Sequence, residues 1–205
     1  MDIVLTLLAI VVAWRLLCLQ YQRGHIALLG RHLARLQIER HMETLTQGYT
    51  RAIHEKDTSR QLQILDGFSQ TERTVAAQLR TLAEAMRTED EQATRMGILP
   101  FCVPYLERFL PTSTRDFRAL LDIHAQGLRR VVDNADRWGP KERAYHLSAE
   151  LYLMQHSCHW YCKSRSVADV RLSVRHQVTR QKVLDSVSDE TRQAYLRWLR
   201  SGAGG

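Results

Sequence analysis

The chain contains few of the residues that interrupt helices. Its 205 residues include only four prolines and ten glycines, and three of these glycines lie in the C-terminal tail, residues 201–205. Both residue types are enriched in turns, and a fold of many short strands needs many turns. Their scarcity therefore argues against a many-stranded β fold and favours long helices, so we expect an all-α protein.

The chain also lacks the short motifs that mark common enzymes. It has no glycine-rich phosphate loop, no His-Glu-x-x-His zinc motif, no nucleophile elbow and no Glu-x-x-His pair of a di-iron bundle. No reaction is indicated by what remains. We therefore expect a protein that is not an enzyme and that uses no cofactor.

Lysine is scarce as well, because only four of the 29 basic residues are lysines and the net charge of +7 comes from arginine. Residues 15–41 hold five arginines against the single acid Glu39. Single-strand binders interleave aromatic residues with such bases, and this chain does not. The basic stretch instead follows a hydrophobic one, which indicates a membrane surface rather than nucleic acid. We expect no nucleic-acid partner.

The hydrophobic stretch covers residues 3–19, where Arg15 is the only charged residue. As a helix it would be about 25 Å long, slightly under the ~30 Å hydrocarbon core of a bilayer. A cleaved signal peptide would have positive charge before this run, but only Met1 and Asp2 precede it. The sequence predicts an uncleaved transmembrane anchor over residues 1–21, with a buried or partner-binding helix as the alternative.

The arginines near this run all lie on its C-terminal side, which by the positive-inside rule places the N-terminus outside and the rest of the chain in the cytoplasm. We expect a single-pass protein of the bacterial inner (cytoplasmic) membrane with reduced cysteines, since cytosolic disulfides are rare. The histidines of this basic region are expected to be solvated or to face the membrane. The basic residues expected at the lipid surface are Arg15, Arg23, Arg31 and Arg35.

Apolar periodicity divides the rest of the chain into a basic stalk with a coiled-coil-like helical hairpin (residues 22–97), a helical bundle (98–200) and a flexible tail (201–205). The stalk is predicted to be helical to about residue 56, and its apolar face changes sides near residue 37. We predict that the first of these faces binds a partner. Its residues are Leu29, Leu33 and Leu36.

Several helix ends carry recognisable signals. We predict capping by Thr58, by Ser113 or Thr114, and by Ser188, a helix end at Gly97, and a junction at Gly139-Pro140. The proline-containing connector, residues 98–111, is apolar enough to form a short buried segment or to rest on a membrane surface. Residues 169–178 alternate as a strand would but also fit a helix, and we predict a helix because no partner strand is evident.

Residues 156–162, with the sequence HSCHWYC, combine two histidines and two cysteines. On a helix Cys158, His159 and Cys162 share one surface, and zinc would need a further donor. The residues that the fold could bring there are Cys102, His124, His146 and His176. Cysteines are often buried, and Cys-x3-Cys within a helix is not a common zinc spacing, so we predict packing and keep a metal site as the alternative.

These expectations describe an anchored adaptor, assembly factor, or exclusion or immunity-type protein of a bacterial envelope system. It would act through protein contacts at the cytoplasmic face of the membrane. Its partners would be membrane lipid and another protein, or a second copy of itself. The alternative is a membrane-tethered metal or redox sensor that uses Cys158, His159 and Cys162.

Overall fold

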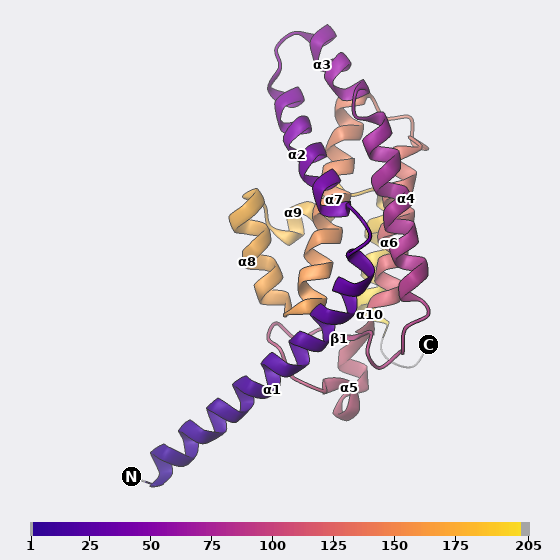
Figure 1. The fold of residues 1–205 in the computed structure, drawn as a ribbon. Coiled ribbons are helices and arrows are strands. Elements are labelled where there is room, and N and C mark those ends of the chain that lie inside the picture. Colours follow the sequence, from indigo (N-terminus) through magenta and orange to yellow (C-terminus); the bar gives the residue numbers. More distant parts are fainter. Residues whose placement is uncertain (1, 202–205) are drawn as a thin grey trace.

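The computed structural model describes residues 2–201, and within these residues the fold is all-α apart from one short two-stranded ribbon (Figure 1). The first helix, α1 (Asp2–Leu33), is continuous over 32 residues. Figure 1 shows its N-terminal half projecting away from the rest of the molecule, while its C-terminal part lies against the other helices. The expected helical anchor is therefore one end of a longer helix.

The predicted stalk is not continuous, because α1 ends at Leu33 and α2 (Ile38–His54) begins after a four-residue turn. The Leu36 backbone N–H closes this turn on the Leu33 carbonyl at 2.9 Å. The prediction of one helix to residue 56 was wrong at this point. The apolar face changes sides near residue 37 because the chain changes direction there, which lets both faces pack on the same core.

The hairpin consists of α2 and α4 (Ser69–Met86), with α3 (Thr58–Asp66) at its tip (Figure 1). Asp57 rather than Thr58 caps α3, since its carboxylate accepts from the Arg60 backbone N–H at 3.1 Å. Phe68, between α3 and α4, packs on Gly48 of α2. A Cβ at position 48 would lie 2.1 Å from the Phe68 ring. Gly48 therefore lets the Phe68 ring pack directly on the backbone of α2.

A buried ion pair fastens the hairpin to α7 (Pro140–Cys162). Glu72 of α4 is 2% exposed, and one of its carboxylate oxygens accepts from the Arg143 guanidinium at 2.6 Å. The Tyr49 hydroxyl donates to the other oxygen at 2.5 Å. Burial, reinforced by the Glu72 charge, raises the pKa of Tyr49. The group thus joins α2, α4 and α7.

The central helix of the bundle is α7, as its apolar surface on all sides predicts. It packs against α1, α2, α3, α6 (Phe117–Val132), α8 (Arg165–His176) and α9 (Arg180–Ser186). Gly139 and Pro140 begin it as expected. Residues 169–178 fall mainly in α8, so the helix prediction is confirmed there, and Ser188 caps α10 (Asp189–Arg200).

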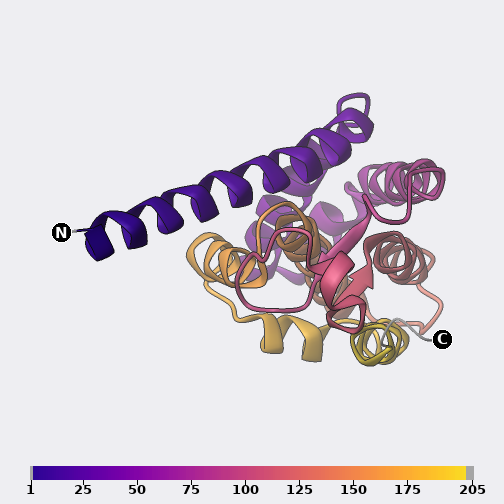
Figure 2. The ribbon, with the colours of Figure 1, turned by 90° about the horizontal axis from the view of Figure 1, so that it is seen from below.

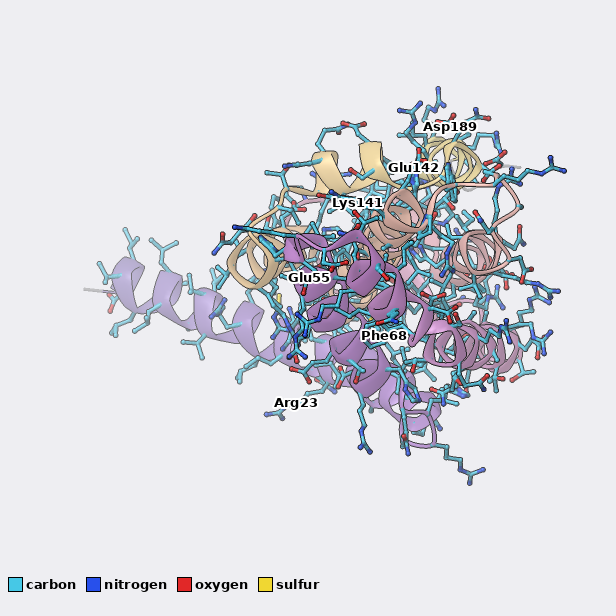
Figure 3. The ribbon with its side chains drawn as sticks, turned by 90° about the horizontal axis from the view of Figure 1, so that it is seen from above. Arg23, Glu55, Phe68, Lys141, Glu142 and Asp189 are labelled. Atoms are coloured by element: carbon cyan, nitrogen blue, oxygen red, sulfur yellow. The ribbon has the colours of Figure 1, made fainter. Side chains whose placement is uncertain are left out.

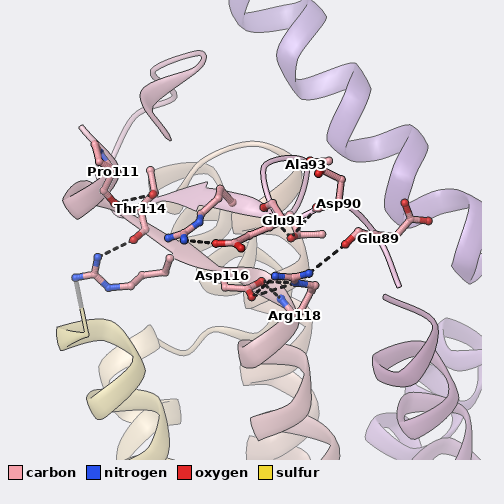
Figure 4. Close-up of polar contacts among 11 residues, drawn as sticks. Glu89, Asp90, Glu91, Ala93, Pro111, Thr114, Asp116 and Arg118 are labelled. Atoms are coloured by element: carbon pink, nitrogen blue, oxygen red, sulfur yellow. Dashed lines mark hydrogen bonds and ion pairs between the residues drawn. The ribbon is translucent and has the colours of Figure 1, made fainter. Parts of the chain in front are cut away.

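The connector region differs from the prediction at both ends. Gly97 does not end a helix but closes β1 (Arg95–Gly97), which pairs with β2 (Thr114–Asp116). Asp116, not Ser113 or Thr114, caps α6 by accepting from the Arg118 backbone N–H at 2.8 Å. Figure 4 shows Arg118 also bridging to the Glu89 carbonyl. Cross-strand pairing therefore overrides the local capping signals. Between the strands lie α5 (Leu106–Phe109) and a 3-10 turn (Pro111–Ser113).

One hydrophobic core extends from Leu28 to Trp198 and includes residues of both the hairpin and the bundle. The predicted boundary at residues 97/98 lies in the connector, and the core crosses it through contacts of α4 with α6 and of α2 with α7. The C-terminal part of α1, the hairpin and the bundle therefore share one core. The predicted flexible tail lies outside the described residues, except for Ser201.

Candidate membrane anchor and its junction with the bundle

The N-terminal half of α1 exposes large apolar side chains on all of its faces. One helix, α1, is long and apolar enough to cross a membrane, with a mean hydropathy of 2.3 over its best 18 residues. Only 6% of that window is buried, whereas the core helix of a soluble protein is mostly buried. The exposed side chains, 44% to 77% exposed, are Ile3, Val4, Leu5, Leu7, Leu8, Ile10, Val11, Val12, Trp14, Leu16, Leu17 and Leu19.

This surface has a large energetic consequence. Burying one such side chain is worth about 1.5 kcal/mol or more, so covering twelve half-exposed ones amounts to on the order of 10 kcal/mol. A contiguous apolar surface of this kind marks a membrane or protein contact. Covering the apolar side chains of residues 3–19 is therefore strongly favourable compared with leaving them in water.

The connector packs on α1 directly after the apolar run. The Cys18 thiol lies 3.7 Å from the Cys102 carbonyl oxygen, and the Tyr21 hydroxyl donates to the Glu107 carboxylate at 3.1 Å. The rings of Tyr21 and Tyr105 meet edge to face at 5.3 Å. The end of the run is thus fixed to the bundle by several contacts within one helical turn.

The next turn of α1 enters the core through His25, which sequence reasoning expected to be solvated or membrane-facing. His25 is 7% exposed, its Nδ1 lies 2.8 Å from the Tyr161 carbonyl oxygen, and its ring stacks on the Tyr161 ring at 4.3 Å. Burial lowers the pKa of His25, so the ring is neutral at physiological pH. It is a structural residue at the junction.

All four predicted surface arginines are exposed, three of them at different heights along α1 and Arg35 in the turn that follows it. Arg15 and Arg23 flank the end of the apolar run, and Arg23 points away from the bundle (Figure 3). Arg31 lies twelve residues beyond Leu19, about 18 Å along the helix, and Arg35 lies past its end. Only the first two are therefore within headgroup reach of a bilayer around residues 3–19.

A further cation at this height was missed in the sequence. The Lys163 ammonium, at the end of α7, donates to the Gln22 side chain at 3.2 Å. Nothing local to Lys163 predicts this, because 141 positions separate the two residues. The tertiary fold alone brings it beside the anchor.

The predicted partner-binding leucines contact the protein's own core. Leu29 is 3% exposed, and Leu33 and Leu36 are partly buried against the same core. Binding of a partner at this face stays a prediction, but in this fold it would require α1 to separate from the bundle.

The HSCHWYC segment packs within α7 and against α8. Burial raises the pKa of the Cys158 thiol far above its usual range and that of Cys162 to about 11. Burial also lowers the pKa of His159 to about 4, and the Arg171 guanidinium donates to its Nδ1 at 3.0 Å. Both thiols are therefore held in the protonated form, and binding of zinc would require each of them to release its proton.

The residues that were considered as further metal donors have other contacts. The Cys102 carbonyl contacts the Cys18 thiol, and the His124 ring is hydrogen-bonded to the Ser157 hydroxyl. The His146 ring stacks on Trp138, and the His176 ring stacks on Tyr152. Within residues 2–201, no three His, Cys, Asp or Glu side chains converge in a way that could hold a metal ion.

A second buried polar group lies between α6, α7 and α10. One Glu150 oxygen accepts from the Ser188 backbone N–H at 3.2 Å and from its hydroxyl at 3.1 Å. Burial raises the pKa of Glu150 to about 7, while burial lowers the pKa of His124 to about 3. Both residues are only 1% exposed, so they are sealed from any substrate and serve packing.

Gly127 makes this arrangement possible. A Cβ at this position would lie 2.1 Å from the Thr191 hydroxyl and 2.7 Å from a Glu150 carboxylate oxygen. The absence of a side chain allows α6 to approach the carboxylate closely.

Comparison with known proteins adds no relative to this description: no family model, no curated protein and no solved structure matches the chain.

Proposed function

We propose that this protein is a single-span membrane protein whose helical bundle acts by non-catalytic protein contacts, as an adaptor, assembly factor, or exclusion or immunity-type protein of a bacterial envelope system. One observation carries the proposal. A closed, well-packed bundle is joined by a continuous helix to an apolar segment that projects from it uncovered on every face. Membrane lipid is the environment that covers such a segment.

The charge distribution supports the orientation. Arg15 lies near the C-terminal end of the apolar run, Arg23 follows the run, and Lys163 contacts Gln22 just beyond it, whereas Asp2 is the charged side chain at the other end. Basic residues remain on the cytoplasmic side of a membrane. We therefore place the bundle in the cytoplasm and the N-terminus outside, in the inner membrane of a bacterium. The four cysteines are free in the part of the chain that the structure describes, as is usual for proteins of the cytoplasm.

The anchor can be tested without disturbing the bundle. Leu8 and Val11 are each 58% exposed, so changing both to Asp leaves every core contact in place. Each acid costs about 2.5 kcal/mol or more at the centre of a membrane helix. We expect wild-type protein in the membrane fraction after carbonate extraction and the double variant in the soluble fraction. Leu62→Asp, at an exposed site of α3, serves as the control and should stay in the membrane.

Recovery of the wild-type protein in the soluble fraction would contradict the span. A protease-protection assay on intact spheroplasts then tests orientation, since an external bundle would be digested. Partner proteins can be captured from detergent-solubilised membranes. The same capture with the double variant then distinguishes partners that need the anchor from partners that bind without it.

The metal or redox sensor alternative has less support from the geometry, because within residues 2–201 no three His, Cys, Asp or Glu side chains converge to hold a metal ion. Metal analysis of the purified full chain decides it. Stoichiometric zinc or iron that Cys158→Ser removes would favour the sensor.

A further inference from the structure

We propose that the connector, residues 98–111, is a second membrane-contact element that inserts Phe101, Phe109 and Leu110 into the interfacial layer of the bilayer that α1 spans. The inference rests on the proposed anchor and adds a site to it. The lipid surface would then hold the bundle in a fixed orientation through two separate points.

The exposure of the connector is the first observation. Phe101 is 62% exposed, Phe109 is 78% exposed and Leu110 is 53% exposed. Trp14, within the anchor itself, is 45% exposed. The segment does have a buried side, because Leu106 is only 4% exposed. Its inner residue thus fastens it to the body while the outer apolar residues point away from it.

The position of the connector is the second observation. Its contacts with α1 are made by Cys102, Tyr105 and Glu107, and they reach Cys18 and Tyr21, on either side of the last apolar residue of the run. If residues 3–19 span the hydrocarbon core, these contacts hold the connector at the level of the headgroups. Insertion would therefore require no change of fold.

The ribbon agrees with this placement. In Figure 1, α5 lies at the end of the molecule from which α1 projects, opposite α3 at the tip of the hairpin. Figure 2 shows the same end from below, with α5 and its preceding loop facing the viewer beside α1. The start of α8 belongs to the same end, since the Ser166 backbone N–H donates to the Pro100 carbonyl at 2.9 Å.

The chemistry of the segment suits an interface between lipid and water. The exposed Arg108 guanidinium lies 5.0 Å from the centre of the Tyr105 ring, and Arg108 directly precedes the exposed Phe109 in the chain. The acid of the segment, Glu107, is turned toward the Tyr21 hydroxyl instead. Aromatic rings with an adjacent cation are typical of residues that sit among headgroups.

Photo-crosslinking of the full-length protein in liposomes tests the proposal. Benzoylphenylalanine replaces Phe109 in one variant, Ile10 of the anchor in a second and Leu62 of α3 in a third. All three positions are exposed, so the probe displaces no core contact. The liposomes contain phosphatidylethanolamine and phosphatidylglycerol, and mass spectrometry measures the lipid adduct on each variant after irradiation.

We expect lipid adducts at positions 109 and 10 and almost none at position 62. Moving one phenylalanine side chain from water to an apolar phase shifts an equilibrium by about tenfold or more, so the adduct at 109 should exceed that at 62 by at least about tenfold. If position 10 gives lipid adducts but position 109 gives none, or gives adducts to protein instead, the inference about the connector is overturned while the anchor remains supported. Absence of lipid adducts at 10 would overturn the anchor and this inference with it.

Discussion

Replacing Glu150 by glutamine should stabilise the bundle, and the gain should depend on pH. The Glu150 carboxyl is fully buried, and its pKa in the folded protein is about 7 instead of 4.5. The unfolded chain therefore releases this proton near pH 4.5, while the folded protein holds it to about pH 7. Because the unfolded state binds fewer protons over this window, the free energy of unfolding falls as pH rises from 4.5 through 7.

The size of the effect follows from the two pKa values. At about 1.36 kcal/mol for each pH unit between 4.5 and about 7, ionisation costs the folded state roughly 3 kcal/mol by pH 8. Glutamine keeps the shape of the protonated acid and carries no proton to lose. We expect Glu150→Gln to match the wild type near pH 4.5 and to be more stable by roughly 2 to 3 kcal/mol at pH 8.

Urea unfolding of the full chain in mild detergent, followed by tryptophan fluorescence, measures this difference from pH 4.5 to 8.5. The lowered pKa of His124 acts in the opposite direction: its contribution to the free energy of unfolding is lost as pH falls from 6.5, the usual histidine pKa, toward about 3. Because His124 is present in both proteins, this contribution cancels in the difference between them. Glu142→Gln, at an exposed site of the same helix, is the control and should show a flat difference. A flat difference for Glu150→Gln, or a variant less stable than wild type at pH 8, would refute the reasoning.

Two further predictions concern the hairpin. Gly48→Ala should destabilise the protein by about 1 to 3 kcal/mol, because the new methyl group meets the Phe68 ring. Gly30→Ala is the control and should be neutral or slightly stabilising, since no atom lies within 4 Å of the new methyl group. Equal unfolding midpoints of the two variants in urea would count against the packing of Phe68 on Gly48. Arg143→Met should lower the free energy of unfolding by about 3 to 5 kcal/mol, because it leaves the Glu72 carboxylate buried without its cation. Adding Glu72→Gln should restore part of that loss in the same urea assay. Additive losses in the double variant would contradict the coupling of the two residues.

Much of the fold was predictable because its signals are local. The apolar run of residues 3–19 forms a single helix, and the Gly139-Pro140 junction and Ser188 each act within about one helical turn; the structure follows all three. The central place of α7 was also readable, since a helix with apolar residues on every side has to be enclosed. Local signals failed at Thr58 and at Thr114, where a neighbouring aspartate caps the helix instead.

The candidate site was only half predictable for the same reason. The sequence indicated the anchor by composition, and it indicated four arginines as lipid-surface cations, of which the fold puts only Arg15 and Arg23 near the end of the run. It did not indicate Lys163, or that the connector meets α1 at Tyr21, because these contacts join residues more than 80 positions apart. Such contacts depend on the path of the whole chain, which no local pattern records.

By itself the sequence determined that the chain is helical, that its N-terminal segment is long and apolar enough to span a membrane, and where several helices begin. Only the tertiary structure decided which side chains share an environment. It buried His25 and Leu29 in the core, raised the pKa of the Cys158 and Cys162 thiols, and left Phe101, Phe109 and Leu110 of the connector exposed. Burial and pairing are set by neighbours distant in sequence, and they fix the charge state and accessibility on which function depends.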